Sequence, residues 1–419
     1  MGVRRLMSLL ARFAPGSISM PKERDLAGQT MAIDSNIFVQ RFFRGTDGGC
    51  DERRHLRGIY NLTKYLVSMQ VTPLFVFDGQ MRASGKEIEM VKRKEERMRI
   101  LQQLEAERQR AQRVGVMVGI RERLLSDHVR QQGVQSTTEA VRWLESNCTY
   151  IRARRSHSAQ KTIDGRLDEL ELEASQLLLF QLGSDTQMEN VAQLDTLQAV
   201  DALQTYNAER IQTLERRSEP LRTGMIEDCE RLVRALGMAT LVADCEESEG
   251  VCAHLCRDSL VECVCSEDLD VVAFGGRLLR GLYAGDSKAP LTLIDAVAAR
   301  EELGLSRESF VDLCILCGTD FASTIEKVGP ITALRLIQEH GSIERILGLQ
   351  KYSAREDFTF QNARNVFLSD GPPRFASREQ MLSRCSGMPD PQTVELLLPM
   401  QAQPHKQTSD PFARGTILL

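Results

Sequence analysis

Two short apolar segments in the first eighty residues have the pattern of buried β-strands. Residues 31–33 end on Asp34, and residues 74–77 end on Asp78. Between them, apolar residues recur at helical spacing over residues 55–70. A strand, a helix and a second apolar strand predict a parallel sheet with a crossover helix. Both aspartates would then lie at carboxyl ends of strands, where open α/β sheets place their ligands.

The same alternation resumes in the second half of the chain. Residues 229–250 predict a helix, a strand and a turn, and the apolar strand 261–265 precedes a turn that carries Asp268 and Asp270. Residues 310–347 predict two helices around a Gly-Pro turn. Beyond about residue 350, clusters of proline and glycine favour loops or disorder over a core.

Residues 84–225 interrupt this α/β pattern. Residues 84–113 predict a densely charged helix, a pattern typical of a solvated face. Residues 114–225 are rich in Gln, Glu and Leu and predict two helices that pair through apolar positions. On the first of these helices the positions are Leu167, Leu170, Ala174 and Leu177. We interpret this segment as an insertion without a constellation of ligand residues.

Composition and cysteine usage indicate the kind of environment in which the protein works. With 42% apolar and 26% charged residues the chain can bury a sizeable core, and no apolar run approaches the ~18 residues of a membrane-spanning helix, so we expect a soluble protein. The eleven cysteines form no disulfide framework, which favours a reducing compartment. Cys314 and Cys317 form a lone CxxC in an apolar helical run, which favours a core helix over a zinc site.

The net charge of −5 conceals a basic N-terminal part. Residues 1–120 hold 21 Lys and Arg against 13 Asp and Glu, a balance of +8. A basic region that faces phosphate is therefore compatible with an acidic remainder. The opening residues 1–15 have apolar positions at helical spacing with arginines between them, which fits either an organelle transit peptide or the first helix of the fold.

Seven acidic residues share one context, a position at or just after an apolar segment. They are Asp34, Asp78, Glu247, Glu249, Asp268, Asp270 and Asp320. Any one of them alone is a common turn or N-cap residue. Glu247 and Glu249 are two residues apart, as are Asp268 and Asp270. In extended backbone this spacing would place both side chains of each pair on one face.

Converging carboxylates need a cation to offset their repulsion, and hard oxygen ligands favour Mg²⁺ or Mn²⁺. Two such ions about 3.5–4 Å apart would serve phosphodiester cleavage. The strand would deliver Asp78 to a metal, and Gly79 would let the backbone turn away.

Several stretches together resemble the flap endonucleases, in the superfamily of structure-specific 5′ nucleases that includes the xeroderma pigmentosum G protein. The resemblance covers roughly residues 1–99 and 226–348. The matching stretches occur in family order and are "MGVRRLMSLLARFAP", "MAID", "HLRGIY", "PLFVFDG", "EESEGVCAHL", "SEDLDVVAFG", "FVDLCILCGTDF" and "VGP…ALRLIQEHGSIERIL". It favours the first helix of the fold over a transit peptide for residues 1–15.

The resemblance implies a metal site built from the seven acids. One group would surround Asp34, Asp78 and Glu249, and a second would surround Asp268, Asp270 and Asp320, with Glu247 assisting. Glu246 is a spare glutamate in the same stretch.

The resemblance also implies DNA-contacting residues. Lys86 and Arg93, seven apart on the charged helix, would reach the scissile phosphate, and that helix would begin an arch for single-stranded flaps. Gly2 would lie near the active site. Gly329 and Pro330 would form the turn of a helix-two-turn-helix that grips duplex backbone, with Lys327 replacing some of the lost basic charge.

Three departures from the family pattern stand out. Gln40 occupies the place of a base-stacking aromatic residue, with Phe38 and Phe42 nearby. The turn lacks the family's first glycine and following basic residues, which predicts a weaker or altered grip on duplex DNA. Asp78 and Glu247 are 169 residues apart, about a hundred more than in cellular flap endonucleases, and no sliding-clamp peptide is recognisable. A different partner bound through residues 114–225, or an unusual replication system, would account for this.

The sequence therefore predicts an α/β fold of the 5′ nuclease, PIN-like type, with a central, mainly parallel sheet flanked by helices, a helical arch and a C-terminal helix-two-turn-helix. We divide it into an N-terminal nuclease region (1–99), an arch and coiled insertion (100–225), an internal nuclease region (226–350) and a partly disordered tail (351–419). We expect two Mg²⁺ ions, with Mn²⁺ as a substitute.

The predicted activity is Mg²⁺-dependent structure-specific 5′ flap endonuclease and 5′–3′ exonuclease cleavage of branched or gapped DNA in replication and repair. We expect no membrane partner, and a nuclear location, with the mitochondrion or a site of viral DNA replication as alternatives. A rival hypothesis is a binding or regulatory protein with a relict nuclease site, although relict sites usually lose carboxylates. A metallohydrolase using "DLD" as nucleophile lacks the downstream motif that it would need.

Overall fold

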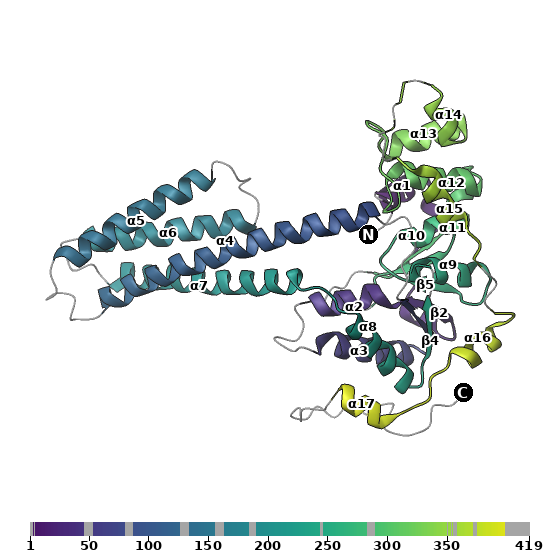
Figure 1. Ribbon diagram of the computed structural model, residues 1–419, viewed down its shortest axis with the longest axis horizontal. Coiled ribbons are helices and arrows are strands. Elements are labelled where there is room, and N and C mark those ends of the chain that lie inside the picture. Colours follow the sequence, from purple (N-terminus) through teal and green to yellow (C-terminus); the bar gives the residue numbers. More distant parts are fainter. Residues whose placement is uncertain are drawn as a thin grey trace. The chain divides into compact units, whose positions relative to one another are not determined.

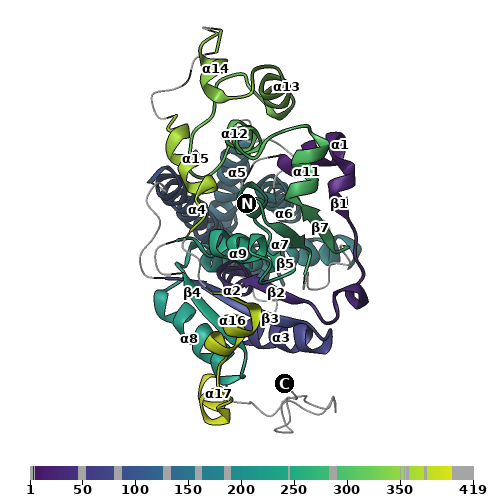
Figure 2. The same ribbon diagram turned by 90° about the vertical axis from the view of Figure 1, so that its right-hand side faces the viewer.

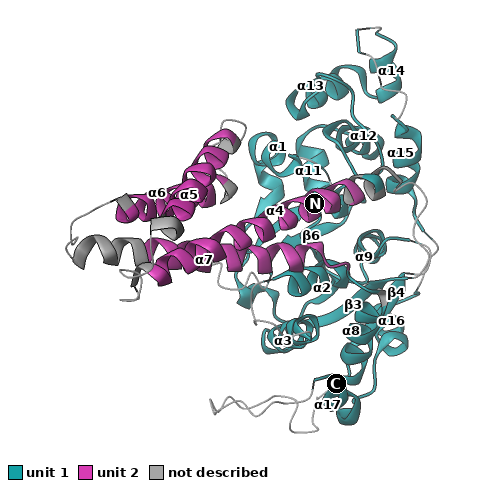
Figure 3. Cartoon of the chain, turned by 60° about the vertical axis from the view of Figure 1, so that its left-hand side comes forward, with its two compact units in different colours: residues 1–93, 221–419 teal, residues 94–220 magenta. Residues whose placement is uncertain are grey.

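The computed structural model comprises two compact units (Figure 3). The first contains residues 1–93 and 221–419, and the second contains residues 94–220. The structure describes the following residues: 3, 5–45, 53–79, 87–125, 134–155, 163–183, 190–243, 246–282, 290–349, 351–352, 354, 358–371 and 375–398. No helix in these ranges is both long and apolar enough to cross a membrane.

The first unit is built on a seven-stranded sheet with the order β1-β7-β6-β5-β2-β3-β4. Strands β4, β3, β2, β5 and β6 are parallel, and β7 pairs antiparallel with both β6 and β1. Their bounds are β1 Ile18–Ser19, β2 Thr30–Asp34, β3 Thr72–Asp78, β4 Ala239–Ala243, β5 Cys263–Cys265, β6 Arg277–Arg280 and β7 Thr292–Asp295. The predicted mainly parallel α/β sheet is confirmed, although the sequence reading did not anticipate β1, β6 and β7.

Alternate residues of the central strands enter two separate hydrophobic cores. In β2, Ala32 belongs to one core, whereas Met31 and Ile33 belong to the other. This alternation follows from the two-residue period of a strand, and it requires helices on both faces of the sheet. Both faces are covered accordingly (Figures 1 and 2).

The helices of the first unit divide between these cores. Helices that contribute to the Ala32 core are α1 Leu6–Phe13, α9 Ser248–Arg257, α10 Asp270–Ala273, α11 Ala296–Glu302, α12 Arg307–Cys317, α13 Pro330–His340, α14 Ile343–Leu347, α15 Phe360–Leu368 and α16 Arg378–Cys385. Helices that contribute to the other core are α2 Ser35–Arg44, α3 Arg54–Ser68, α8 Thr223–Ala235 and α17 Pro391–Leu397. Short 3-10 turns lie at Pro15–Ser17 and Glu23–Leu26.

Two expectations about individual segments are settled by this packing. Leu6, Leu9 and Leu10 of α1 are buried, so residues 6–13 form a packed helix of the fold. Cys314 and Cys317 lie buried in α12, which confirms the core helix.

The expectation of loops beyond residue 350 is wrong for residues 360–368, 378–385 and 391–397, which form α15, α16 and α17. Phe360 and Phe367 of α15 are buried in the Ala32 core, and Arg53 binds the carbonyl oxygens of Leu396 and Leu397 at the end of α17. Residues 369–371 lie in the connection after α15, whereas Pro391 is the first residue of α17, a position that suits proline at a helix start.

In its described residues the second unit has four long helices, of which the last two coincide with the two helices predicted within residues 114–225, whereas the one that begins at residue 134 was not predicted. The four helices are α4 Glu87–Leu125, whose first residues belong to the other unit, α5 Val134–Arg155, α6 Ile163–Gly183 and α7 Asn190–Ser218. Leu167 and Ala174 are buried in their common core as expected, and Leu170 and Leu177 are half-buried. Met117 of α4 and Leu144 of α5 complete that core, so the charged helix packs there and is not merely solvated.

A buried ionic network crosses this helical unit. The Arg110 side chain is fully buried and donates to Glu107, Asp168 and Glu171, with 2.9 Å to Glu171. Arg113 donates to the other oxygen of Glu171 at 2.6 Å.

Two asparagines connect the remaining helices to this network. Asn207 of α7 donates to Glu107 at 2.9 Å, and Asn147 of α5 donates to Ser175 of α6 at 3.2 Å. The dense charge of residues 84–113 predicts a solvated helix, so the burial of Arg110 corrects that expectation.

Candidate metal centre

The carboxyl ends of β2 and β3 place two of the predicted acids side by side on the sheet edge. Asp34 pairs with Val76 in the register of the two strands, and Asp78 is two residues further along β3. One oxygen of Asp78 accepts the Asn36 side-chain amide, and the other accepts the Ser248 backbone N–H at 2.9 Å. Asp78 is thereby fixed from both adjoining segments.

Glu247 and Glu249 reach this edge from the start of α9. Glu247 is the N-cap residue and Glu249 lies in the first turn, where the helix dipole favours negative charge. One oxygen from each of Asp78, Glu247 and Glu249 lies within 4.8 Å of the others. We call these three residues the first triad. Glu246, the spare glutamate, instead pairs with His254 at 3.3 Å.

Asp268 and Asp270 form a second triad with Glu249, again with oxygens within 4.8 Å of one another. Both aspartates follow β5, and Asp270 is the first residue of α10. Its backbone N–H donates to Asp268 at 3.0 Å. Glu249 therefore belongs to both triads.

Glu247 and Glu249 lie close together, as do Asp268 and Asp270, but the prediction that extended backbone would bring each pair together was wrong. Neither pair lies in extended backbone on one face of a strand. Each pair spans the junction between a loop and the start of a helix, α9 or α10. The change of backbone direction at a helix start brings the two carboxylates together.

The grouping also differs from the one that the resemblance implied. Among the described residues, Glu247 joins the first triad, Glu249 is shared, and Asp34 and Asp320 belong to neither group of that spacing. Asp34 is buried, and its oxygens accept the hydroxyls of Ser248 at 2.9 Å and Ser266 at 2.7 Å. Asp320 is half-buried, three residues beyond the end of α12.

The electrostatics of the edge favour a bound cation. Burial is the largest cause that raises the pKa of Asp34, the hydroxyls of Ser266 and Ser248 oppose it, and the charges of Asp78 and Asp268 add to it, with a net pKa of about 7. Clustered carboxylates repel one another, and they are hard oxygen donors that suit Mg²⁺ or Mn²⁺. The five triad residues therefore fit divalent metal.

Sequence reasoning missed three polar residues at this site: Asn36, Ser248 and Ser266. All three are buried and hydrogen-bonded to Asp34 or Asp78. A signal was present for the serines, because Ser248 lies between Glu247 and Glu249, and Ser266 lies two residues before Asp268. Their hydroxyls are suited to orient neighbouring carboxylates.

Two models of known protein families match this chain, one before the insertion and one after it. The XPG N-terminal domain matches residues 1–100, and the XPG I-region matches residues 237–320. All seven predicted acids lie inside these two segments, and the two segments together supply the sheet edge described above. Both matches support the XPG and flap endonuclease superfamily for these two segments of the chain.

Curated relatives of the superfamily match at moderate identity. Flap endonuclease 1-A of Sorghum bicolor is 38% identical over 172 residues, which are 40% of this chain and 45% of that protein. The match to flap endonuclease 1 of Zea mays spans 46% of that protein, so this chain covers less than half the length of either. Flap endonuclease 1-A of Oryza sativa subsp. japonica is 26% identical over 381 residues, 88% of this chain and 75% of that one.

A solved structure of the catalytic core of Rad2 in complex with DNA substrate has the same fold. It matches with a TM-score of 0.50 and 15% identity, covering 95% of this chain and 99% of the Rad2 chain.

The structure does not describe the side chains of the residues that the resemblance implies for contact with the scissile phosphate. Gly2 and Lys86 lie outside the described residues, and Arg93 lies in α4 without a described side chain. Near the place of the superfamily's stacking aromatic, Phe38 is buried in the core and the ring of Phe42 packs against Gly58. The described part of this segment therefore presents Gln40, half-buried, in place of an exposed aromatic ring.

The helix-two-turn-helix that the resemblance implies would lie at α12 and α13. Lys327 is exposed and has a left-handed backbone, with φ of 62°. Gly329 is the N-cap residue of α13 and Pro330 its first residue, and no side chain caps this helix end. The first-turn amide groups of α13 are therefore not covered by a cap, as a phosphate contact would require.

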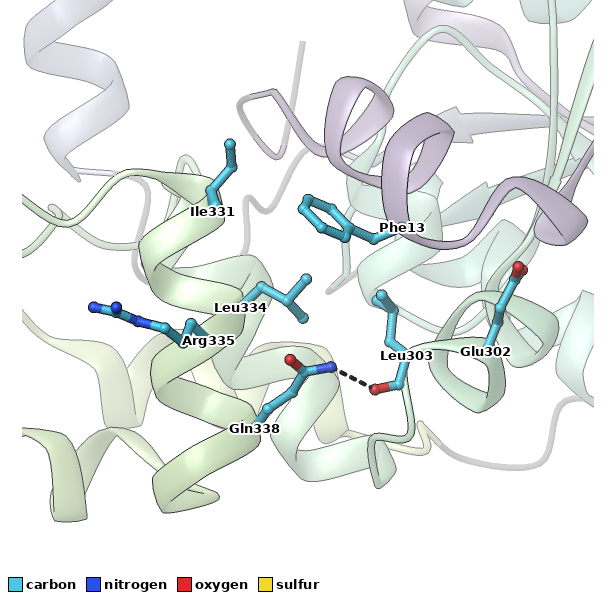
Figure 4. A pocket seen from close by; sticks show the side chains of 7 residues that line it. All are labelled: Phe13, Glu302, Leu303, Ile331, Leu334, Arg335 and Gln338. Carbon is cyan, nitrogen blue, oxygen red and sulfur yellow. Dashed lines mark hydrogen bonds between the residues drawn. The ribbon is translucent and has the colours of Figure 1, made fainter.

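A small cavity of about 170 Å³ lies beside α13, and no triad residue lines it (Figure 4). Phe13 of α1 faces Ile331 and Leu334 of α13 across it, and Gln338 donates to the Leu303 carbonyl at 3.0 Å. These contacts hold α13 against α1 and the end of α11.

An ionic network also fixes the position of α14. Arg364 of α15 donates to both oxygens of buried Asp312, at 2.8 and 2.7 Å, and to Glu344 of α14. Asp312 also accepts the Ile343 backbone N–H at 3.0 Å. Hydrogen bonding to Arg364 lowers the pKa of Glu344 to about 2, whereas burial raises the pKa of Asp312 despite its partners.

Replacing Arg364 with glutamine is expected to lower the free energy of unfolding by about 2–3 kcal/mol near pH 7, because buried Asp312 loses its charged partner. The folded-state pKa of Glu344 lies below its ordinary value of 4.5, so its contribution is present above about pH 4.5 and is lost as the pH falls toward 2. The difference between wild type and variant should therefore shrink in acid.

Urea unfolding followed by circular dichroism at pH 7 and pH 3 measures this difference. Arg277→Gln is the control, because Arg277 forms a surface pair with Asp295 at 3.1 Å and should cost less than about 1 kcal/mol. A difference for Arg364→Gln that stays constant with pH would contradict the assignment.

Proposed function

We propose that this chain is a divalent-metal-dependent, structure-specific nuclease that hydrolyses phosphodiester bonds at single-strand to duplex junctions of DNA. The observation that carries the proposal is the pair of carboxylate triads that share Glu249 at the carboxyl edge of the sheet. The names of the curated relatives, flap endonucleases, support a 5′ flap as the substrate.

The five triad residues would hold the metal. A pair of Mg²⁺ or Mn²⁺ ions bound there would supply a water of lowered pKa and stabilise the leaving oxygen. Asn36 and the Ser248 amide hold Asp78 in its orientation, and the first turn of α9 stabilises the charge of Glu249.

Other parts of the chain would position the substrate. We propose that Lys86 and Arg93 contact the scissile phosphate, and that Lys327 and the amide groups after Gly329 contact duplex backbone. We also propose that Gly2 lies near the cleaved strand, that Asp320 assists the second triad, and that the helical unit 94–220 serves flap passage or a protein partner. Replication or repair in the nucleus is the proposed setting.

Cleavage of a panel of end-labelled DNAs tests this function. The full chain is expected to cut a 5′-flap duplex near the junction in Mg²⁺ or Mn²⁺, to cut intact duplex far less, and to be inactive with EDTA. Asp78→Asn should abolish cleavage, because it removes a charge from the first triad. Nicked, gapped, bubble and RNA-flap substrates in the same panel define the preferred structure.

The opposite result would favour the rival function. Tight binding of junction DNA by the intact chain, with no cleavage in either metal, would contradict a nuclease and support a binding protein on the nuclease fold. The complete set of triad carboxylates favours the nuclease.

A further inference from the structure

Two buried serines connect Asp34 to both triads. Ser248 and Ser266 are each 1% exposed, and each donates its hydroxyl to a different oxygen of Asp34, at 2.9 and 2.7 Å. Asp34 thus uses both oxygens on serines, and it belongs to neither triad. This arrangement calls for an explanation, because a buried carboxylate is costly unless its hydrogen bonds serve the fold or the site.

Each serine also engages one triad by a second bond. The backbone N–H of Ser248 donates to Asp78 at 2.9 Å, in the first triad. The hydroxyl of Ser266 accepts the backbone N–H of Asp268 at 3.0 Å, in the second triad. Asp268 in turn accepts the N–H of Asp270 at 3.0 Å.

We propose that Asp34, Ser248 and Ser266 form one positioning unit that sets the two triads at the separation needed for metal binding. The inference rests on the proposed function and deepens it. Asp34 comes from β2, Ser248 from the start of α9, and Ser266 from the loop after β5. Asp34 thus links the segment that carries Glu247 and Glu249 to the segment that carries Asp268 and Asp270, and Ser248 adds the backbone bond to Asp78 of β3. Metal affinity then depends on hydroxyls that do not touch the metal.

The geometry predicts unequal contributions from the two serines. Ser266→Ala removes two hydrogen bonds, to Asp34 and from Asp268. Ser248→Ala removes only the hydroxyl bond to Asp34, because the backbone N–H to Asp78 remains. Outer hydrogen-bond partners of metal ligands typically contribute about 10- to 100-fold in affinity. We expect a loss of about tenfold or more for Ser266→Ala and a smaller loss, about threefold, for Ser248→Ala.

Calorimetric titration of Mn²⁺ into metal-free full-length protein, without DNA, tests the proposal. Ser17→Ala is the matched control, because Ser17 is a buried serine of the same unit that donates to the Ala14 carbonyl at 2.6 Å. It should bind Mn²⁺ like wild type. Ser266→Thr keeps the hydroxyl and should restore most of the affinity. Melting temperatures of the metal-free proteins separate lost folding from lost affinity.

The outcomes distinguish this inference from the proposed function. Wild type that binds Mn²⁺, with both alanine variants binding equally well, would overturn the positioning role and leave the nuclease proposal intact. Wild type that binds no Mn²⁺ would overturn both. If Ser266→Ala does not fold, the Ser248→Ala and Ser266→Thr affinities still decide, since equal losses in all variants, Ser17→Ala included, would indicate a merely structural effect.

Discussion

Glu249→Gln is expected to reduce DNA cleavage by about a hundredfold to a thousandfold at fixed Mg²⁺, because Glu249 is the residue that both triads share. Glutamine keeps the size of the side chain and one carbonyl oxygen, but it removes a negative charge from both groups at once. Loss of several kcal/mol of charge stabilisation corresponds to this range of rates. Single-turnover cleavage of an end-labelled 5′-flap duplex measures the change.

Glu246→Gln provides the control, three residues away in the same segment. Glu246 pairs with His254 at 3.3 Å and belongs to neither triad. Its replacement should leave the cleavage rate within a few-fold of wild type. Equal losses for the two variants would show that the segment, and not the shared carboxylate, is what cleavage needs. Cleavage by Glu249→Gln at the wild-type rate would remove the main support for the site.

Arg110→Met is expected to destabilise the helical unit by about 3–5 kcal/mol, the usual cost of removing one partner from a buried ionic network. Methionine retains much of the volume of arginine, so the loss is chiefly electrostatic. It removes the Arg110 guanidinium from Glu107, Asp168 and Glu171, and Arg113 remains bound to Glu171. In the wild type, burial raises the pKa of Glu171, but Arg113 and Arg110 outweigh burial and lower it.

The chain offers a specific probe for this unit. Trp143 of α5 is its single tryptophan and packs against the core of the four helices. Urea unfolding followed by Trp143 fluorescence should shift to lower urea by on the order of 2 M in Arg110→Met. Circular dichroism of the same samples also reports on the first unit.

Arg108→Met is the matched control for Arg110→Met. Arg108 lies on the same helix and pairs with Glu215 at 2.8 Å, but both side chains are about half exposed. Exposed pairs contribute about 0–1 kcal/mol, so the Trp143 transition should move little. If both variants moved it equally, the network would have no special role in the unit.

The strands and their terminal acids were predictable from local pattern. Residues 31–33 and 74–77 are apolar and short, each stops at an aspartate, and both lie in the observed strands β2 and β3. The starts of α9 and α10 were not predictable in the same way. The sequence gives spacing along the chain, whereas convergence of Glu247 with Glu249 depends on where a helix begins.

The buried ionic network of the insertion could not be predicted from local sequence pattern either. Arg110 occupies a charged position of α4, and such positions are normally solvated. Only the packing of α6 against α4 makes Asp168 and Glu171 its neighbours. No pattern within α4 itself distinguishes Arg110 from exposed Arg108.

The sequence by itself therefore determined the α/β sheet and the aspartates that end its strands β2 and β3, because apolar period and polar strand ends are local properties. Its motifs also indicated the resemblance to a nuclease superfamily. Tertiary structure alone decided that Glu249 serves two groups, that Asp34 binds Ser248 and Ser266, and that the insertion buries its charges. Those facts are distances between side chains far apart in the chain, and only packing sets such distances.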